Sequence, residues 1–356
     1  MTSATIESSP AEHAAHQAST TIEVDSEAGS AAGYDSDTGS TSLSSSIRDH
    51  SFEFGRRYHR YQEGLYQFPN DEPEQEREDM KHYALITAMG DRLHYAPIRD
   101  DPENILDLGT GTGIWCVEMG EQYPSALVQG VDLSPIQPTW LPPNVKFLVD
   151  DAEAPWVYPT DYFGLVHARH TVQAFRNYLG MLKQAHRQAL TARQAPTAVA
   201  DSTHRHLRPG GWVELHEMNY TPSCDDGSMP DDYQLAKLLG LIGQGLAAMG
   251  INLDGVHNIK SQLRDAGFVN VHERTFKLPF GPWPKDRLLK KVGTYYQAIA
   301  MDGLQAIALR PLCKGLGWMT EEVEVFLTGV RKHLMDPSIH TYQVLHVIYA
   351  QKPQPS

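Results

Sequence analysis

An acid followed by three alternating glycines forms the segment of this sequence best suited to hold a charged ligand. Asp107 lies in the apolar run 104–108, and three glycines follow it at every second position: Gly109, Gly111 and Gly113. The next ten residues are amphipathic. The pattern predicts a strand, a tight loop and a helix start, an arrangement that brings backbone close to a nucleotide-like ligand.

The acid indicates which ligand the loop would accept. A dinucleotide site has the spacing Gly-x-Gly-x-x-Gly, with bare backbone facing a pyrophosphate, whereas here the third glycine comes one residue early. A carboxylate at Asp107 would repel a phosphate and attract a cation, such as the ammonium group of S-adenosylmethionine (SAM). The glycines would let the adenosyl and methionine parts lie against the backbone.

Two further apolar runs also lead into acids. The run 127–132 ends at Asp132, and an acid at the end of the second strand of a doubly wound sheet accepts hydrogen bonds from ribose hydroxyls. The run 145–150 continues into Asp151. Three strands that deliver acids to one edge of a sheet indicate a SAM site much more strongly than a glycine loop alone.

The elements that position these acids alternate between strand and helix. This alternation predicts a doubly wound, mostly parallel α/β sheet with right-handed crossovers. The expected parallel strands are 105–108, 127–132, 145–149, 163–168 and 211–216, the last opened by Pro-Gly-Gly at 209–211. A late apolar run at 342–350 is expected to form an antiparallel edge pair with 269–276.

Helices are expected between and beyond these strands. The first begins at Asp71, where Pro73 and Glu74 complete a start that resembles a capping box. Its apolar face is expected to hold Leu85, Ile86, Met89 and Leu93. The later helices are expected at 178–187, 232–249, 258–266, 285–309 and 320–334, the last capped by Thr320.

Negative charge is concentrated at the start of the chain. The 356 residues carry a formal net charge of −14. The first 50 contain eight acids and one base, a net charge of −7. Residues 1–50, rich in Ser and Thr, are therefore expected to be a disordered acidic tail. The remainder is only mildly acidic, which argues against a nucleic-acid partner.

Cysteine usage and apolar runs bear on the compartment. Cys116, Cys224 and Cys313 are widely spaced, which favours a reducing intracellular compartment, either cytoplasmic or nuclear. Neither a secretory leader nor a membrane span is expected. The histidines at 167 and 170, and those at 204 and 206, lack acids or cysteines at ligand spacing, so no metal site is expected.

Residues 188–205 interrupt an otherwise ordinary connection. This stretch is rich in Ala, Thr and Gln and contains Pro196. The residues on either side would join as one helix and turn without it. We therefore interpret 188–205 as an insertion: a surface loop, a longer helix or translated non-coding sequence.

Several longer motifs identify the chain more specifically. They lie at 58–71, 106–115, 132–138 (Asp-Leu-Ser-Pro-Ile-Gln-Pro), 142–147, 150–156 (Asp-Asp-Ala-Glu-Ala-Pro-Trp), 166–169 and 207–214. With them the chain resembles the fungal LaeA-like class I SAM-dependent methyltransferases, which act in secondary metabolism as regulators or gene-cluster members. The resemblance implies a Rossmann-like sheet of seven strands with the last antiparallel. It also implies an N-terminal helical segment and a helical lid at about 280–335, in a methyltransferase domain at 51–356.

The resemblance also assigns roles position by position. Asp107, Gly109, Gly111 and Gly113 would surround the methionine part of SAM, Asp132 would hold the ribose hydroxyls, and Leu133 would lie against the adenine. Asp151 and Ala152 would meet the adenine amino edge, and Arg169 and His170 would face the sulfonium and the acceptor. Two departures stand out: Gly164 replaces the usual Asp of a Phe-Asp pair, which would loosen the fourth strand, and 188–205 would displace the adjacent edge.

Methyl transfer from SAM requires in-line placement, and it requires a base when the acceptor must lose a proton. His170 and His216 follow predicted strands and are the candidate bases, with Glu217 a weaker one. Each also has an ordinary structural interpretation. Tyr61, Tyr66 and Trp283 are candidate walls of an acceptor pocket.

The sequence leaves the function open between three hypotheses. The first is a methyltransferase that acts on a small-molecule acceptor in secondary-metabolite biosynthesis. The second is a SAM-binding regulator of metabolite gene expression, acting in a nuclear protein complex. The third is a SAM-binding relic without turnover, suggested by Gly164 and the insertion.

Overall fold

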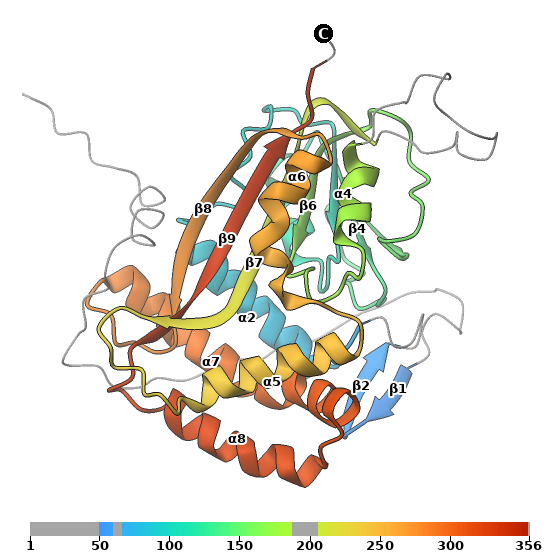
Figure 1. Cartoon of the computed structure of the whole chain (residues 1–356). Coiled ribbons are helices and arrows are strands. Elements are labelled where there is room, and N and C mark those ends of the chain that lie inside the picture. Colours follow the sequence, from blue (N-terminus) through green and yellow to red (C-terminus); the bar gives the residue numbers. More distant parts are fainter. Residues whose placement is uncertain (1–49, 60–65, 187–205, 355–356) are drawn as a thin grey trace, which may run out of the picture.

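The computed structural model describes residues 50–59, 66–186 and 206–354. Its centre is a seven-stranded sheet with the order β5-β4-β3-β6-β7-β9-β8 (Figure 1). The strands are β3 (Asn104–Leu108), β4 (Leu127–Asp132), β5 (Val145–Val149), β6 (Phe163–Arg169), β7 (Leu207–Cys224), β8 (Val269–Pro279) and β9 (Thr341–Gln351). Strands β3 to β7 are parallel, and β9 runs antiparallel between β7 and β8. The predicted fold class is confirmed.

The strand order reverses at β3, because β4 lies on one side of it and β6 on the other. In open α/β sheets, ligands bind beyond the carboxyl ends of the strands at such a switch point. The predicted glycines lie in the loop after β3, and Asp132 is the last residue of β4. The topology therefore brings the predicted ligand site together at one edge.

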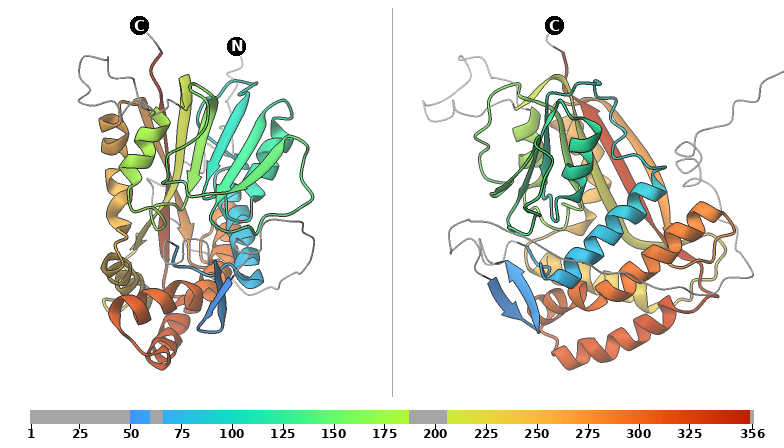
Figure 2. Two further views of the ribbon diagram at one scale, coloured as in Figure 1. Left: turned by 90° about the vertical axis from the view of Figure 1, so that its right-hand side faces the viewer. Right: turned by 180° about the vertical axis from the view of Figure 1, so that it is seen from behind.

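Helices cover both faces of the sheet and one end of it. They are α2 (Glu72–Ala88), α3 (Ile114–Gln122), α4 (Tyr178–His186), α5 (Gln234–Ala248), α6 (Ile259–Asp265), α7 (Arg287–Arg310) and α8 (Thr320–Leu334). The α4 and α6 helices lie on one face, and α2 and α3 lie on the other (Figure 2). The α5, α7 and α8 helices gather at one end, beside the hairpin of β1 (His50–Glu53) and β2 (Arg56–His59) (Figure 1).

Apolar side chains fill the space between these layers. One cluster packs α3 against β3, β4 and β6 around Trp115, whose indole is 1% exposed. A larger cluster packs α5, α7 and α8 against the ends of β7, β8 and β9. Burial of such large apolar side chains provides the main stabilisation of the fold. The helical end is therefore packed firmly against the sheet.

Three boundaries differ from the predictions. Helix α2 ends at Ala88 because Gly90 (φ 69°) turns the backbone left-handed, so Leu93 lies outside the helix. The α8 helix has Met319 as its N-cap, with Glu322 bonded back to the Met319 N–H, so Thr320 is the first helical residue instead. The Pro-Gly-Gly segment lies inside β7, which begins at Leu207 and is longer than predicted.

Gly164 does not prevent the fourth parallel strand from forming. A Cβ at this position would lie 2.3 Å from the Pro102 carbonyl oxygen, so the close approach requires glycine. The register of β6 against β7 shifts between Phe163 and Leu165, and regular pairing resumes at once. The predicted tail at 1–50 and the insertion at 188–205 lie outside the described residues, apart from His50 at the start of β1.

Among the described helices, none combines the length and apolar character that a membrane span needs.

Candidate cofactor and acceptor site

The glycine loop after β3 has the left-handed backbone that its glycines predict. Gly109, Gly111 and Gly113 have φ values of 66°, 58° and 81°. A Cβ on Gly111 would meet no atom within 4 Å, so this part of the loop borders open space. Gly113 has a different role, because a Cβ there would lie 2.3 Å from the Phe147 ring of β5. Gly113 permits close packing of α3 on the sheet and does not line the cleft.

Asp132 lies directly opposite this loop. Its carboxylate accepts hydrogen bonds from the backbone N–H groups of Gly111 and Ser134, both at 2.8 Å. Burial raises the pKa of the Asp132 carboxyl to about 6, although these bonds act in the opposite direction. The carboxylate is thereby fixed at the end of β4, where its remaining lone pairs can accept from a ligand.

A cleft of about 1000 Å³, partly open to solvent, follows the carboxyl edge of the sheet. Eight of the predicted site residues line it: Gly109, Gly111, Asp132, Leu133, Asp151, Ala152, Arg169 and His170. Its lining is mainly apolar with a few polar groups, as is usual for cofactor sites. The structure therefore brings most of the predicted residues together.

Asp107 lies deeper, in a recess that adjoins the cleft at Gly109 and Arg169. Its Oδ1 atom accepts a hydrogen bond from Nδ1 of His167 at 2.7 Å. The His167 ring stacks on Trp115 with a centroid separation of 3.8 Å. Burial raises the pKa of Asp107 to about 6 and lowers that of His167 well below its ordinary value. A neutral His167 therefore orients a buried acid toward the recess.

Arg169 places a positive charge at the cleft. Its Nη1 atom donates to Nδ1 of His82 at 2.9 Å, and Nε2 of His82 donates to Glu118 at 2.9 Å. Burial and the charge of Arg169 both lower the pKa of His82, so the imidazole is the neutral acceptor that this chain requires. The chain from Glu118 to Arg169 fixes the guanidinium between α2 and the glycine loop.

His170 occupies a strained position just after β6. Its backbone is left-handed (φ 57°), which is uncommon for a residue other than glycine, and its N–H donates to the His216 carbonyl oxygen at 2.9 Å. The ring Nε2 atom is buried and has no hydrogen-bond partner in the described structure. Burial lowers the pKa of His170 well below its ordinary value. The ring is therefore a neutral imidazole, and His170 lines the cleft.

The other candidate bases lie one layer behind. His216 is fully buried, and its Nε2 atom pairs with Glu214 at 2.6 Å. Glu217 accepts from the backbone N–H of Thr171 at 2.8 Å and from the Thr171 hydroxyl at 2.7 Å. Burial raises the pKa of Glu217 to about 7. Glu217 thus holds the segment that carries His170. Neither His216 nor Glu217 lines the cleft.

The candidate pocket walls are also separated. Tyr66 lines the cleft, whereas Trp283 packs with Leu289 and Tyr342 away from it. Tyr61 lies outside the described residues. Of these three, the structure places Tyr66 at the site.

One face of α2 was missed by the sequence interpretation. Glu74, Glu78 and Lys81 line the cleft from this helix. They recur at intervals of three or four residues, a spacing that puts them on one helical face. That periodicity was the available signal, but the sequence alone does not show that the charged face turns inward.

A doubly wound α/β sheet with a cleft at its switch point defines a cofactor-binding α/β protein. The chain matches the family described as "Methyltransferase domain" over residues 75–273. Methyltransferase pytC of Aspergillus terreus is 38% identical, over 93% of this chain and 96% of that protein. The secondary metabolism regulator LAE1 of Cochliobolus heterostrophus is 33% identical, over 85% and 94% of the two chains. The protein-methionine methyltransferase laeA of Emericella nidulans is 32% identical, over 85% and 76%. The chain belongs to this family of fungal LaeA-like methyltransferases, as its motifs predict.

Proposed function

We propose that this protein is a SAM-dependent methyltransferase that methylates a small-molecule acceptor of secondary metabolism. The observation that carries the proposal is the placement of His170, a neutral and unpartnered imidazole, at the edge of a cleft bounded by Asp132 and the glycine loop. A general base within reach of a bound cofactor is what an acceptor hydroxyl or amine requires. A relative at 38% identity that is named a methyltransferase supports the same activity.

The residues present fit SAM. Asp132 has lone pairs free for ribose hydroxyls, and Leu133 and Ala152 offer apolar contact to the adenine, with Asp151 at its amino edge. The open space at Gly111 admits a ligand close to backbone. Asp107 and Arg169 carry opposite charges beside the same recess, as the ammonium and carboxylate of the methionine part require.

The protein's own contribution to the reaction is placement and proton removal. Bound SAM supplies a methyl group that is already activated by its sulfonium. His170 would accept the acceptor proton at Nε2, and the bonds from Glu217 to Thr171 would hold the His170 segment in position. Because burial lowers its pKa well below the ordinary value, the ring is in the neutral, proton-accepting form throughout the physiological range.

The test of cofactor binding is the removal of Asp132. We expect Asp132→Ala to weaken SAM binding in isothermal titration calorimetry by about 100-fold or more, because charge-assisted hydrogen bonds are lost. Asp132→Asn should lie between this variant and the wild type, since it retains an acceptor oxygen. The exposed Asp231→Ala is the matched control. Unchanged affinity in a folded Asp132→Ala protein, checked by circular dichroism, would overturn the SAM assignment.

The relatives named as a regulator and as a protein-methionine methyltransferase favour a second candidate function. In it the chain binds SAM and acts on gene expression within a nuclear protein complex. Affinity purification that recovers transcriptional regulators, from cells whose metabolite extracts carry no label from methyl-labelled methionine, would favour this function. For either function we infer an intracellular location, cytoplasmic or nuclear, supported by the three free cysteines.

A further inference from the structure

A second cavity adjoins the cofactor cleft on its helical side. It lies between α2, α5, α7 and β7, and its empty space of about 750 Å³ includes the part that is open to solvent. Six residues line both spaces: Tyr66, Glu74, Glu78, Lys81, His170 and Gln173. The two cavities therefore meet at His170, the residue that carries the unpartnered ring nitrogen.

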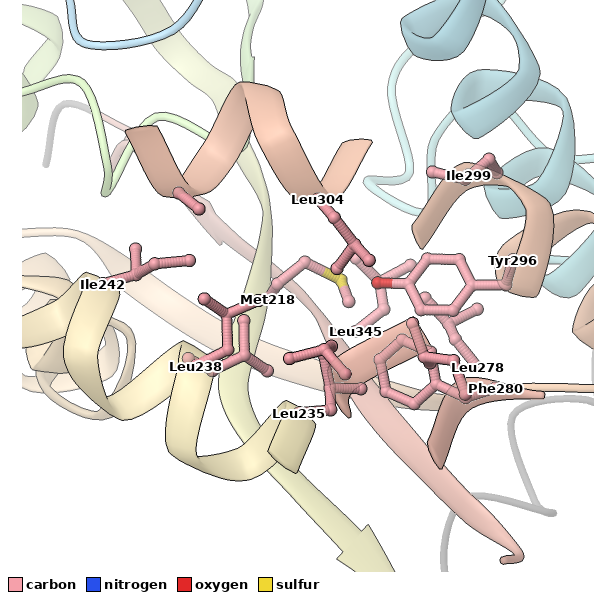
Figure 3. Close-up of a cluster of buried hydrophobic side chains, with 14 of the residues drawn as sticks. Met218, Leu235, Leu238, Ile242, Leu278, Phe280, Tyr296, Ile299, Leu304 and Leu345 are labelled. Carbon is pink, nitrogen blue, oxygen red and sulfur yellow. The ribbon is translucent and has the colours of Figure 1, made fainter. Parts of the chain in front are cut away.

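The deep part of this second cavity is apolar. The side chains that converge there are each at most 5% exposed: Met218 of β7, Leu235 of α5, Leu304 of α7 and Phe280, which follows β8. Figure 3 shows these side chains pointing toward one another between the helices and the strands. The backbone amides or charged groups of a ligand would find few hydrogen-bond partners on such a surface, and buried polar groups need hydrogen bonds. An apolar ligand suits this part of the cavity.

The charged residues at the opening compensate one another. Arg77 pairs with Glu74 at 2.5 Å and also with Glu78, which in turn pairs with Lys81 at 2.5 Å. Burial alone would raise the pKa of Glu78, but Lys81 and Arg77 lower it to about 2, so this carboxylate stays ionised within its pairs. Two acids and two bases leave no uncompensated charge among these four. A charged ligand would gain no counter-ion here, so a neutral ligand is favoured.

Two amide side chains supply neutral polar contacts. The Gln343 carbonyl oxygen accepts from the Tyr296 hydroxyl at 2.6 Å, and that of Gln173 accepts from the Tyr220 hydroxyl at 2.5 Å. In each case the NH₂ group is left to interact with a ligand, as a donor suited to a carbonyl or ether oxygen. Together with Nε2 of His170, these groups mark a few fixed polar positions on an apolar wall.

We propose that this second cavity binds the methyl acceptor. The acceptor is a neutral and largely apolar molecule that lies against Met218 and Leu304, with a hydroxyl directed at His170. The proposal rests on the proposed function and specifies its substrate class. It disfavours a peptide acceptor, whose backbone would bring many polar groups to an apolar floor.

The experiment uses 2-naphthol, a neutral aromatic alcohol, as the probe, titrated into the full-length protein with and without SAM. We expect saturable binding, and at least tenfold weaker binding of 2-naphthoate, which has the same ring system with a carboxylate. Ala300→Phe on α7 adds bulk to the cavity wall and should weaken 2-naphthol binding at least tenfold, with SAM affinity unchanged. Thr294→Phe, on the exposed side of the same helix, is the matched control and should change neither affinity.

The outcomes separate this inference from the proposed function. If 2-naphthol does not bind, if 2-naphthoate binds as well, or if Ala300→Phe has no effect, while SAM still binds, the acceptor class is wrong and the methyltransferase proposal stands. Transfer of labelled methyl from SAM to a methionine-containing peptide, without probe binding, would assign the cavity to a different acceptor class. Failure of the wild type to bind SAM would instead overturn the proposed function. Thermal melts of both Phe variants confirm that each is folded.

Discussion

The cofactor side and the acceptor side of this site are built in different ways. The cofactor side uses residues between Asp107 and Ala152, which follow three adjacent strands and contribute largely through backbone and short acids. The acceptor side joins Tyr66, Met218, Leu235, Leu304 and Gln343, which come from distant parts of the chain. The first depends on local sequence, whereas the second depends on how helices pack.

This difference explains which side can vary between relatives. A glycine that needs a left-handed backbone tolerates few replacements, but an apolar wall tolerates exchange among residues of similar volume. The acceptor cavity can therefore change its ligand without disturbing the cofactor cleft. His170, which lines both spaces, is where the two sides have to meet.

The largest effect is expected at this meeting point. His170→Ala should lower kcat by about 10²–10⁴-fold while SAM affinity stays within about twofold, because the loss removes a general base and leaves Asp132, Asp107 and Arg169 to hold the cofactor. His170→Asn should lower kcat equally, since Asn tolerates the left-handed backbone and offers no base of comparable strength. Steady-state rates with a methylated acceptor and calorimetry with SAM measure the two quantities.

Exchange of an exposed histidine, His272→Asn on β8, is the control and should leave both quantities unchanged. If His170→Asn keeps the wild-type rate, His170 is a structural residue and the two sides share no base. If SAM affinity falls in parallel with the rate, His170 belongs to the cofactor side alone.

Local patterns were sufficient to predict most of the fold. Strands β3 to β6 lie within a residue or two of the predicted positions, because their apolar runs are short and bounded by Gly, Pro or acids. The antiparallel pairing of β9 with β8 was also predicted. The errors concern the first residues of a helix and of a strand. Met319 caps α8 where Thr320 was expected, and β7 begins before Pro209. The start of β7 depends on long-range hydrogen bonds, such as that from the Gly210 N–H to the Lys352 carbonyl oxygen, that a local pattern does not contain, whereas the α8 boundary differs by a single residue.

The candidate site divides in the same way. The glycine loop, Asp132 and His170 were predicted because each follows a predicted strand. The partnership of Asp107 with His167, and the charged face of α2, depend on which elements become neighbours. His216 was a candidate base for the same reason as His170, but alternation along the strand turns its ring into the interior, against Glu214.

A second prediction compares two glycines within the cofactor side. Gly113→Ala should destabilise the protein by about 3 kcal/mol, because the new Cβ meets Phe147 at 2.3 Å and the backbone is left-handed. Gly111→Ala should cost only about 1–2 kcal/mol, since it carries the backbone strain alone and faces open space. Urea denaturation of both variants measures the difference, and equal losses would show that Gly113 is not a packing residue.

The smallest expected effect is a difference in pH dependence between the two sides. Burial raises the pKa values of Asp107 and Asp132 to about 6, so both carboxyls become protonated as the pH falls through 6. Cofactor binding needs both ionised forms, and each required ionisation at this pKa makes SAM binding about tenfold weaker at pH 5 than at pH 7. On the acceptor side, burial holds the pKa of His170 well below its ordinary value, and Lys81 and Arg77 hold that of Glu78 at about 2.

We therefore expect the affinity for 2-naphthol to be constant between pH 8 and pH 6, while SAM affinity begins to fall near pH 6. In Asp132→Asn the fall should become shallower, since only Asp107 then titrates, and the control Asp231→Ala should keep the wild-type profile. Calorimetric titrations at half-unit pH steps give both curves. A SAM affinity that is flat down to pH 5 would mean that neither carboxylate must be ionised for binding. A 2-naphthol affinity that falls together with that of SAM would mean that the same carboxylates control binding in both cavities. The cofactor side and the acceptor side would then not be independent in binding.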